Sequence, residues 1–277
     1  MVLEKFRLDG PPRRVAIVTG GGRGLGREMA LALSAAGADV TIASRTQSQL
    51  DDTATFIEGH TGRRPLTISA DLREAAQCDG VIEQTIAHFG RLDIMLNNAG
   101  VGDRRGGGFR IEELTDDDWR DAIAVNLDSA FYCARAAAKH FRERGEGGVI
   151  INVASGTALR MAGFALGYAS AKGGVISFTK SLAGQLAGEG VRVNCIIPGF
   201  IAQAPPETQE EKDNLAARGR FNTAGRLGEA WEMGPLAVYL ASDASSYVTG
   251  ESFVIDGGGL AGGIAPIDWP APEAANV

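Results

Sequence analysis

A tyrosine and a lysine lie four residues apart in the segment Tyr168-Ala169-Ser170-Ala171-Lys172, and Ser155 comes thirteen residues before the tyrosine. A spacing of four places Tyr168 and Lys172 on one face of a helix, one turn apart. A phenol with a pKa of about 10 is a poor base at neutral pH, but a neighbouring ammonium lowers that pKa by about one unit or more. Alone, the pattern is typical of a solvated tyrosine and lysine. Beside a redox cofactor it predicts that Tyr168 carries a proton.

A candidate cofactor site lies near the N-terminus. The apolar run at 15–18 leads directly into a glycine-rich turn at 19–26, and a helix follows. Glycines let the backbone turn tightly and approach a pyrophosphate, whose charge the helix N-terminus meets. Because the turn follows the first strand of an alternating chain, it predicts dinucleotide binding. The expected contacts are Gly20, Arg23, Gly24, Leu25 and Gly26.

The end of the second expected strand indicates which dinucleotide is bound. NAD-binding proteins place an acidic residue there for the ribose 2′-hydroxyl, whereas NADP-binding proteins tend to place an arginine near the 2′-phosphate. This chain reads Ser44-Arg45 at that point, with no carboxylate at the strand end. Arg45, helped by Arg23, could clamp a phosphate, so NADP(H) is favoured over NAD(H). The alternative is that both arginines are solvated surface charges.

The elements that must position these residues alternate along the chain. Apolar runs rich in Val and Ile predict seven strands buried on both faces, at residues 15–18, 40–43, 66–68, 93–96, 149–153, 191–197 and 253–255. Segments of helix length separate them. The alternation predicts an α/β chain with one doubly wound, Rossmann-type parallel sheet, helices on both faces, and ligands at the carboxyl ends of the strands.

Nothing resembles a linker before residue 258, so we expect a single domain over residues 1–277 with its core at 12–258. The irregular stretch 202–228 is either a lid over the substrate or a solvated surface helix flanked by loops. The tail at 259–277, rich in Gly, Ala and Pro, is either a docked arm or disordered.

The composition excludes several classes of protein. Charged residues make up 22% of the chain and the net charge is −7, which gives no general attraction for nucleic acid or anionic lipid. No apolar run approaches the length of a membrane span, and the first residues lack the features of a secretory signal. The cysteines and histidines show no metal-ligand spacing. We therefore expect a cytoplasmic protein that binds no nucleic acid, membrane or metal.

In their order along the chain, these motifs resemble the short-chain dehydrogenase/reductase family over residues 12–258. They are most similar to 3-oxoacyl-carrier-protein reductases and to gluconate or glucose dehydrogenases. The residues that carry the resemblance are the turn at 19–26, Asp71, the segment Asn97-Asn98-Ala99-Gly100, Asn126, Ser155, Tyr168, Lys172, Pro198-Gly199, and the stretches 239–243, 248–250 and 256–258.

The resemblance implies roles in the reaction for four residues. Ser155 would hydrogen-bond the reacting oxygen, and Tyr168 would be the acid or base. Lys172 would hold the nicotinamide ribose and tune Tyr168, while Asn126 would anchor a water in the proton relay. The family also implies a homotetramer, with the helices that hold Asn126 and Tyr168 at the main interface.

The resemblance also implies further cofactor contacts. Asp71 would meet the adenine amino group, with Leu72 beside it, and Thr19 would bond across to the segment 97–98 in a structural role. The remaining implied contacts are Asn98, Ala99, Gly100, Tyr168, Lys172, Pro198, Gly199 and Ile201.

Two features depart from the family pattern. Gln203 stands where the family often has a threonine that helps to hold the nicotinamide carboxamide; glutamine has a donor and an acceptor and could substitute. The basic loop at 102–110 is either a contact for an anionic group of the substrate or a surface loop, and we favour the surface loop.

The segment between Ser155 and Tyr168 is the expected substrate wall. Besides Ser155 and Tyr168, it offers Thr157 and Phe164, together with Leu159, Met161 and Leu166. These side chains either form an apolar wall, which favours a neutral, carbon-rich ketone or secondary alcohol, or pack into the core or a neighbouring subunit. Acyl thioesters on a carrier protein remain open as substrates.

The sequence therefore predicts an NADP(H)-dependent oxidoreductase that interconverts a ketone and a secondary alcohol. The substrate is expected to be a small molecule, and the sequence leaves its identity open. One alternative is an NAD-dependent sugar or polyol dehydrogenase of the same family. Another is a non-catalytic protein that senses the cofactor on the same fold. A sensor has no need of a proton-transfer set, and Asn126, Ser155, Tyr168 and Lys172 are all present.

Overall fold

The computed structural model describes residues 2–102, 110–160 and 165–262. Seven strands form one parallel sheet with the order β3-β2-β1-β4-β5-β6-β9. They are β1 (Val15–Thr19), β2 (Asp39–Ser44), β3 (Leu66–Ser69), β4 (Ile94–Asn97), β5 (Gly148–Val153), β6 (Val191–Pro198) and β9 (Ser252–Ile255). The predicted doubly wound α/β fold is confirmed, because each expected apolar run is one of these strands.

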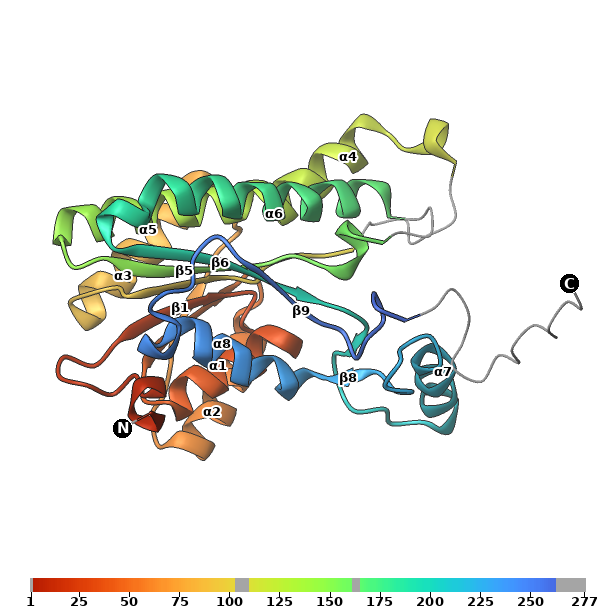
Figure 1. Cartoon of the computed structure of the whole chain (residues 1–277), viewed down its shortest axis with the longest axis horizontal. Helices are drawn as coiled ribbons and strands as arrows, with labels where there is room; N and C mark the ends of the chain where they lie inside the picture. The colour runs from red at the N-terminus through yellow and green to blue at the C-terminus, as the bar shows by residue number, and fades with distance from the viewer. Residues whose placement is uncertain (1, 103–109, 161–164, 263–277) are drawn as a thin grey trace, which may run out of the picture.

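Helices cover both faces of the sheet, as Figure 1 shows. One layer, drawn below the sheet, contains α1 (Gly24–Ala35), α2 (Gln47–Thr61) and α8 (Met233–Ala241). The other face is covered by α3 (Ala75–Phe89), α4 (Asp116–Ile123), α5 (Ser129–Arg144) and α6 (Leu166–Leu186). None of the helices in the described ranges is both long and apolar enough to cross a membrane.

The core is split by the sheet into two apolar layers. In β1, Ala16 and Val18 pack into the layer that holds Leu33 of α1, while Ile17 packs into the layer that holds Cys133 of α5. Successive side chains of a strand point to opposite faces, and here both faces are covered. This is why β1 is apolar throughout, without the alternation that a half-exposed strand would show.

The strand order reverses between β1 and β4, because the chain winds outward from β1 through β2 to β3 and then from β4 toward β9. In a doubly wound sheet the ligand crevice lies at that reversal, outside the carboxyl ends of the strands. The glycine turn follows β1, Ser44 ends β2, and Asn98 follows β4. The topology therefore brings the predicted cofactor residues to one edge of the sheet.

The stretch 202–228 forms a small substructure at the same end of the molecule as the carboxyl end of β6 (Figure 1). Short strands β7 (Ile201–Ala202) and β8 (Gly228–Glu229) pair in parallel, and α7 (Gln209–Gly219) lies between them. Thr208 caps α7, since its hydroxyl accepts from the Glu211 backbone N–H at 3.1 Å. The expected helix flanked by loops is therefore present, and its action as a lid stays a prediction. Residues 263–277 of the expected tail lie outside the described residues.

Candidate active site

A cavity of about 600 Å³ opens along the carboxyl edge of the sheet. Fourteen of the predicted cofactor residues line it: Gly20, Arg23, Leu25, Gly26, Ser44, Arg45, Asp71, Leu72, Asn98, Ala99, Gly100, Tyr168, Lys172 and Pro198. Gly24, Gly199 and Ile201 were also expected as contacts and are not part of the lining. The lining adds residues that the motifs did not indicate, namely Thr46, Gln49, Ala70, Val101, Val125, Val153 and Ala154. Several directly follow a strand or a motif residue, and that position is the signal that could have found them.

The glycine turn has the shape that a pyrophosphate needs. Gly20 and Gly24 have positive φ angles of 64° and 54°, in the region that only glycine adopts easily. A Cβ atom added at Gly26 would lie 2.2 Å from the Gly20 carbonyl oxygen, so α1 can start here only because residue 26 has no side chain. The backbone is thus open to a bulky anionic group at the start of α1.

Thr19 has the structural role that was expected of it. Its hydroxyl oxygen accepts from the backbone N–H groups of Asn98 at 3.0 Å and Ala99 at 3.1 Å. The Asn98 side chain donates in return to the Thr19 carbonyl oxygen at 3.0 Å. These bonds tie the carboxyl ends of β1 and β4 together and fix the floor of the cleft.

The far end of the cleft is lined by Arg23, Ser44, Arg45 and Asp71. A hydrogen bond from Arg73, at 2.5 Å between Arg73 Nη2 and Asp71 Oδ2, holds the pKa of Asp71 below its ordinary value, and the charge of Arg45 adds to that effect. Ser44 Oγ is buried and has no hydrogen-bond partner among the described residues. Two arginines and a hydroxyl without a partner among the described residues therefore line this end of the cleft, and donors of this kind can bind a phosphate.

Lys172 is the buried cation of the site. Its side chain is only 3% exposed, its Nζ donates to the Val153 carbonyl oxygen at 2.9 Å, and Nζ lies 5.8 Å from the centroid of the Tyr168 ring. Burial lowers the pKa of Lys172 to about 8. A Cβ atom added at Gly100 would lie 3.1 Å from Lys172 Nζ and 2.7 Å from Asn126 Oδ1. The backbone at Gly100 therefore passes directly beside both side chains.

Asn126 lies in a π-helical segment, Ala124–Asp128, between α4 and α5. Its side chain is 1% exposed and binds the backbone of Val101 twice, donating to the carbonyl oxygen at 2.9 Å and accepting from the N–H at 3.1 Å. Wide turns of this kind are frequent at functional sites because they interrupt the regular backbone ladder. Asn126 thus joins the strand-end loop after β4 to the helix layer, and its role in anchoring a water stays a prediction.

Ser155 follows β5 and begins a short 3₁₀ turn, Gly156–Ala158. Its hydroxyl oxygen accepts from the Thr157 backbone N–H at 3.2 Å and from the Thr157 hydroxyl at 2.9 Å. With both lone pairs used, the Ser155 proton is free to be donated to a reacting oxygen. Thr157, expected to line the substrate site, is thereby placed to orient Ser155. Phe164 and Met161 of the expected substrate wall lie outside the described residues.

Gln203 follows β7 and lies in the cofactor cleft. Its Oε1 would lie 2.2 Å from a Cβ atom added at Gly24, so the amide packs directly on the glycine turn. Gln203 also lines the cavity. Whether Gln203 could take the place of the family's threonine at the carboxamide was left open by the sequence; in the structure its amide lies against Gly24 of the glycine turn.

The fold and this cleft together define a doubly wound α/β protein with a nucleotide site and a tyrosine–lysine pair at one edge of its sheet. The family model described as "Enoyl-(Acyl carrier protein) reductase" matches residues 20–259. The 2-dehydro-3-deoxy-D-gluconate 5-dehydrogenase of Escherichia coli (strain K12) is 37% identical over 266 residues, which cover 94% of this chain and 100% of the relative. An uncharacterized oxidoreductase of Mycobacterium tuberculosis (strain CDC 1551 / Oshkosh) is 41% identical over 276 residues, with coverages of 99% and 100%.

Among solved structures, that of the NADPH-dependent 3-quinuclidinone reductase from Rhodotorula rubra superposes with a TM-score of 0.82 at 31% identity, over 95% of this chain and 96% of that chain. The chain belongs to the short-chain dehydrogenase/reductase family, whose members are oxidoreductases that bind a nicotinamide cofactor. The resemblance inferred from the motifs is confirmed.

Proposed function

We propose that this protein is an NADP(H)-dependent oxidoreductase that interconverts a ketone and a secondary alcohol, with Tyr168 as the proton donor and acceptor. The observation that carries the proposal is the buried Lys172 ammonium, 5.8 Å from the centre of the Tyr168 ring, in the same cleft as the glycine turn. Burying a cation costs free energy, and buried cations with shifted pKa values are typical of functional sites. Here the cation lies beside a phenol whose ionised form it stabilises.

In the direction of reduction, the carbonyl oxygen of the substrate accepts a hydrogen bond from Ser155, whose own acceptor sites are filled by Thr157. A nicotinamide cofactor, when bound in the cleft, would supply the hydride for the carbonyl carbon. Tyr168 then gives its proton to the oxygen, and the charge of Lys172 stabilises the phenolate that remains. Oxidation of the alcohol follows the same steps in reverse. The glycine turn, Asp71 and the loop at Asn98 would hold the nucleotide.

A substrate screen tests the function directly. Purified protein is mixed with NADPH or with NADH and, in turn, with ketones, β-keto thioesters and keto sugars, and the loss of reduced-nicotinamide absorbance is followed. We expect turnover with carbon-rich ketones. Turnover confined to NAD(H) with sugars would favour a sugar or polyol dehydrogenase, as the E. coli relative's name suggests for that protein. Tight nucleotide binding without turnover on any substrate would favour the sensor.

Cofactor preference gives a second test, and we expect NADPH to bind about ten to a hundred times more tightly than NADH. The reason is that a hydrogen bond to a charged group contributes about 1.5 to 3 kcal/mol, and about 1.4 kcal/mol is a factor of ten. The double variant Ser44→Asp, Arg45→Ala should prefer NADH, because its carboxylate repels a 2′-phosphate and accepts from a 2′-hydroxyl. Fluorescence titration measures both constants. Equal dissociation constants in the wild type would refute the assignment.

We also infer a cytoplasmic homotetramer in which α5 and α6 face a partner subunit. The support is that Trp119 and Phe131, on α4 and α5, are each 41% exposed although both are large and apolar. Light scattering after size exclusion measures the mass, and a monomer at working concentrations would contradict the inference.

A further inference from the structure

A second cavity, of about 330 Å³, lies at the amino ends of β1, β4, β5 and β6, at the edge of the sheet opposite the cofactor cleft. Its lining contains seven charged side chains: Arg14, Arg91, Arg144, Arg192, Asp93, Glu146 and Asp243. Pro12, three glycines and Val149 complete it. Apart from Asp243, which belongs to the stretch 239–243, these charged residues lie outside the motifs, and none of the seven lines the nucleotide cleft.

Asp93 is the buried anion of the cavity, with a side chain only 8% exposed. Its carboxylate accepts hydrogen bonds from the Val15 backbone N–H at 2.8 Å and from Arg91 Nε at 2.9 Å. It also forms an ion pair with Arg144 at 2.9 Å. Hydrogen bonds from these partners outweigh burial, so the pKa of Asp93 is lowered and the carboxylate stays charged. One buried carboxylate thus pairs with two arginines.

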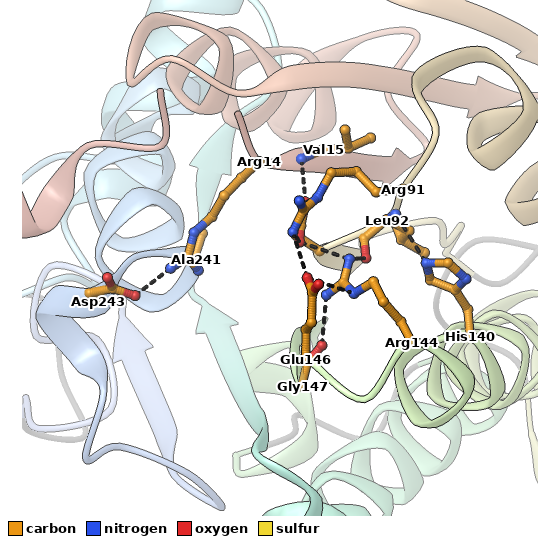
Figure 2. A network of polar contacts seen from close by, with 11 residues as sticks. Arg14, Val15, Arg91, Leu92, His140, Arg144, Glu146, Gly147, Ala241 and Asp243 are labelled. Carbon is orange, nitrogen blue, oxygen red and sulfur yellow. Dashed lines mark hydrogen bonds and ion pairs between the residues drawn. The ribbon is translucent and has the colours of Figure 1, made fainter. Parts of the chain in front are cut away.

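Glu146 supplies the second negative charge from the rim. Its carboxylate lies 3.2 Å from Arg91 and 3.4 Å from Arg144, but its side chain is 58% exposed. Figure 2 shows Glu146 in contact with both arginines, with Arg14 and Asp243 on the other side of the network. Glu146 stands between Gly145 and Gly147, whose φ angles are 73° and 70°. Glu146 therefore lies in a tight turn directly before β5.

Arg192 carries the charge that is least compensated. Within the described part of the chain its guanidinium is held by neutral oxygens alone, those of Ser245 Oγ at 2.8 Å and the carbonyls of Leu240 and Ser242 at 2.9 and 3.0 Å, with a longer contact to Val248. Burial and the neighbouring charge of Arg14 lower the pKa of Arg192, and the charge of Asp243 opposes them only in part. Arg14 itself is paired with Asp243.

The lining therefore holds four guanidinium groups and three carboxylates, and the surplus cation is the one in contact with no carboxylate. A partly buried cation that contacts no carboxylate among the described residues attracts an anion, and guanidinium groups bind oxyanions through paired hydrogen bonds. From this geometry we propose that the cavity is a binding site for a small oxyanion of the phosphate class, with Arg14 and Arg192 on one side and Arg91 and Arg144 on the other.

Glu146 occupies the place of a competing anion in this site. Its exposed carboxylate uses donors of Arg91 and Arg144 that an incoming oxyanion would take, so the anion displaces Glu146 toward solvent. Removing the charge of Glu146 should then strengthen binding, whereas removing an arginine should weaken it. A network that only fastened the strand ends together would show no such opposite effects.

The test is calorimetric titration of the full chain with inorganic phosphate at constant ionic strength, adjusted with sodium chloride. We expect saturable binding that Arg192→Gln weakens by about tenfold or more, because a charged hydrogen bond is lost. Arg14→Gln, at a side chain 30% exposed, should weaken it in the same direction and keeps the test valid if the Arg192 variant fails to fold. Glu146→Gln should tighten binding at least threefold, as expected for removing one carboxylate about 3 Å from the donors.

Two matched variants complete the design. Glu58→Gln removes an exposed carboxylate of α2 that pairs with Arg64. Because this pair lies away from the cavity, phosphate affinity should stay unchanged. Arg45→Ala reports phosphate bound in the nucleotide cleft and should leave unchanged the binding that Arg192→Gln weakens. The proposal is overturned if phosphate does not bind saturably, if Arg45→Ala rather than Arg192→Gln abolishes binding, or if Glu146→Gln weakens it. None of these outcomes depends on the proposed oxidoreductase activity.

Discussion

Replacing Tyr168 by phenylalanine should lower turnover by about 10² to 10⁴, the loss typical of removing a general acid or base. Phenylalanine keeps the ring that Lys172 faces and removes only the hydroxyl that would carry the proton. Nucleotide affinity should therefore change little. Steady-state rates with the best ketone of the screen, together with a fluorescence titration of NADPH, measure the two quantities separately.

A matched control exists in Tyr247, which is fully exposed in the structure. Tyr247→Phe makes the same chemical change away from the cleft and should retain full turnover. A Tyr168→Phe variant that keeps more than about a tenth of wild-type turnover, with the chemical step shown to limit the rate, would be inconsistent with the proposed role.

Replacing Lys172 by methionine should abolish most activity and yet stabilise the free protein at neutral pH. Methionine has a similar length and no charge, so the nucleotide and the Tyr168 phenolate both lose a cation, and residual activity should show its basic limb at higher pH. Burial lowers the pKa of Lys172 from 10.5 to about 8, a difference that corresponds to about 3 kcal/mol of destabilisation at pH 7. The variant also loses the hydrogen bond to the Val153 carbonyl oxygen, which reduces the expected stabilisation by about 1 kcal/mol.

The gain in stability has a defined pH dependence. Below about pH 8 Lys172 is protonated in the folded wild type, and the buried ammonium destabilises the folded protein to its full extent. Between pH 8 and 10.5 this destabilisation falls, because Lys172 loses its proton in the folded state. The difference in unfolding free energy between variant and wild type should therefore be larger at pH 7 than at pH 10. Lys180→Met, at an exposed position of α6, serves as the control. A Lys172→Met variant with unchanged nucleotide affinity and an unchanged pH profile would show that the ammonium takes no part.

The strands and the main cofactor residues could be predicted from sequence because their signals are local. A strand buried on both faces must be apolar along its whole length, so residues 15–18 predict β1 (Val15–Thr19) almost to the residue. Gly20 and Gly26 are required by a positive φ angle and by a close approach within a few residues of chain. The pair Tyr168 and Lys172 needs only the periodicity of one helix.

Other parts of the site depend on contacts that no local pattern reports. The amide of Gln203 packs on Gly24, and the Asn126 side chain binds the backbone of Val101; each contact joins segments that only the sheet topology brings together. Thr157 was expected to line the substrate site, and that stays a prediction; the structure adds that its hydroxyl is directed at Ser155, to which it donates a hydrogen bond. Such directions follow from backbone geometry and cannot be read from residue types.

The sequence by itself determined the fold class, the edge of the sheet at which the nucleotide site lies, and the tyrosine–lysine pair, because helix and strand periodicity and glycine geometry act over short stretches of chain. Only the tertiary structure decided that Lys172 is buried against Val153 and therefore has a lowered pKa. It also decided that Arg14 and Arg192, which lie in no motif, share one cavity at the opposite edge. Burial and charge proximity depend on which distant segments pack together, and that packing is a property of the whole folded chain.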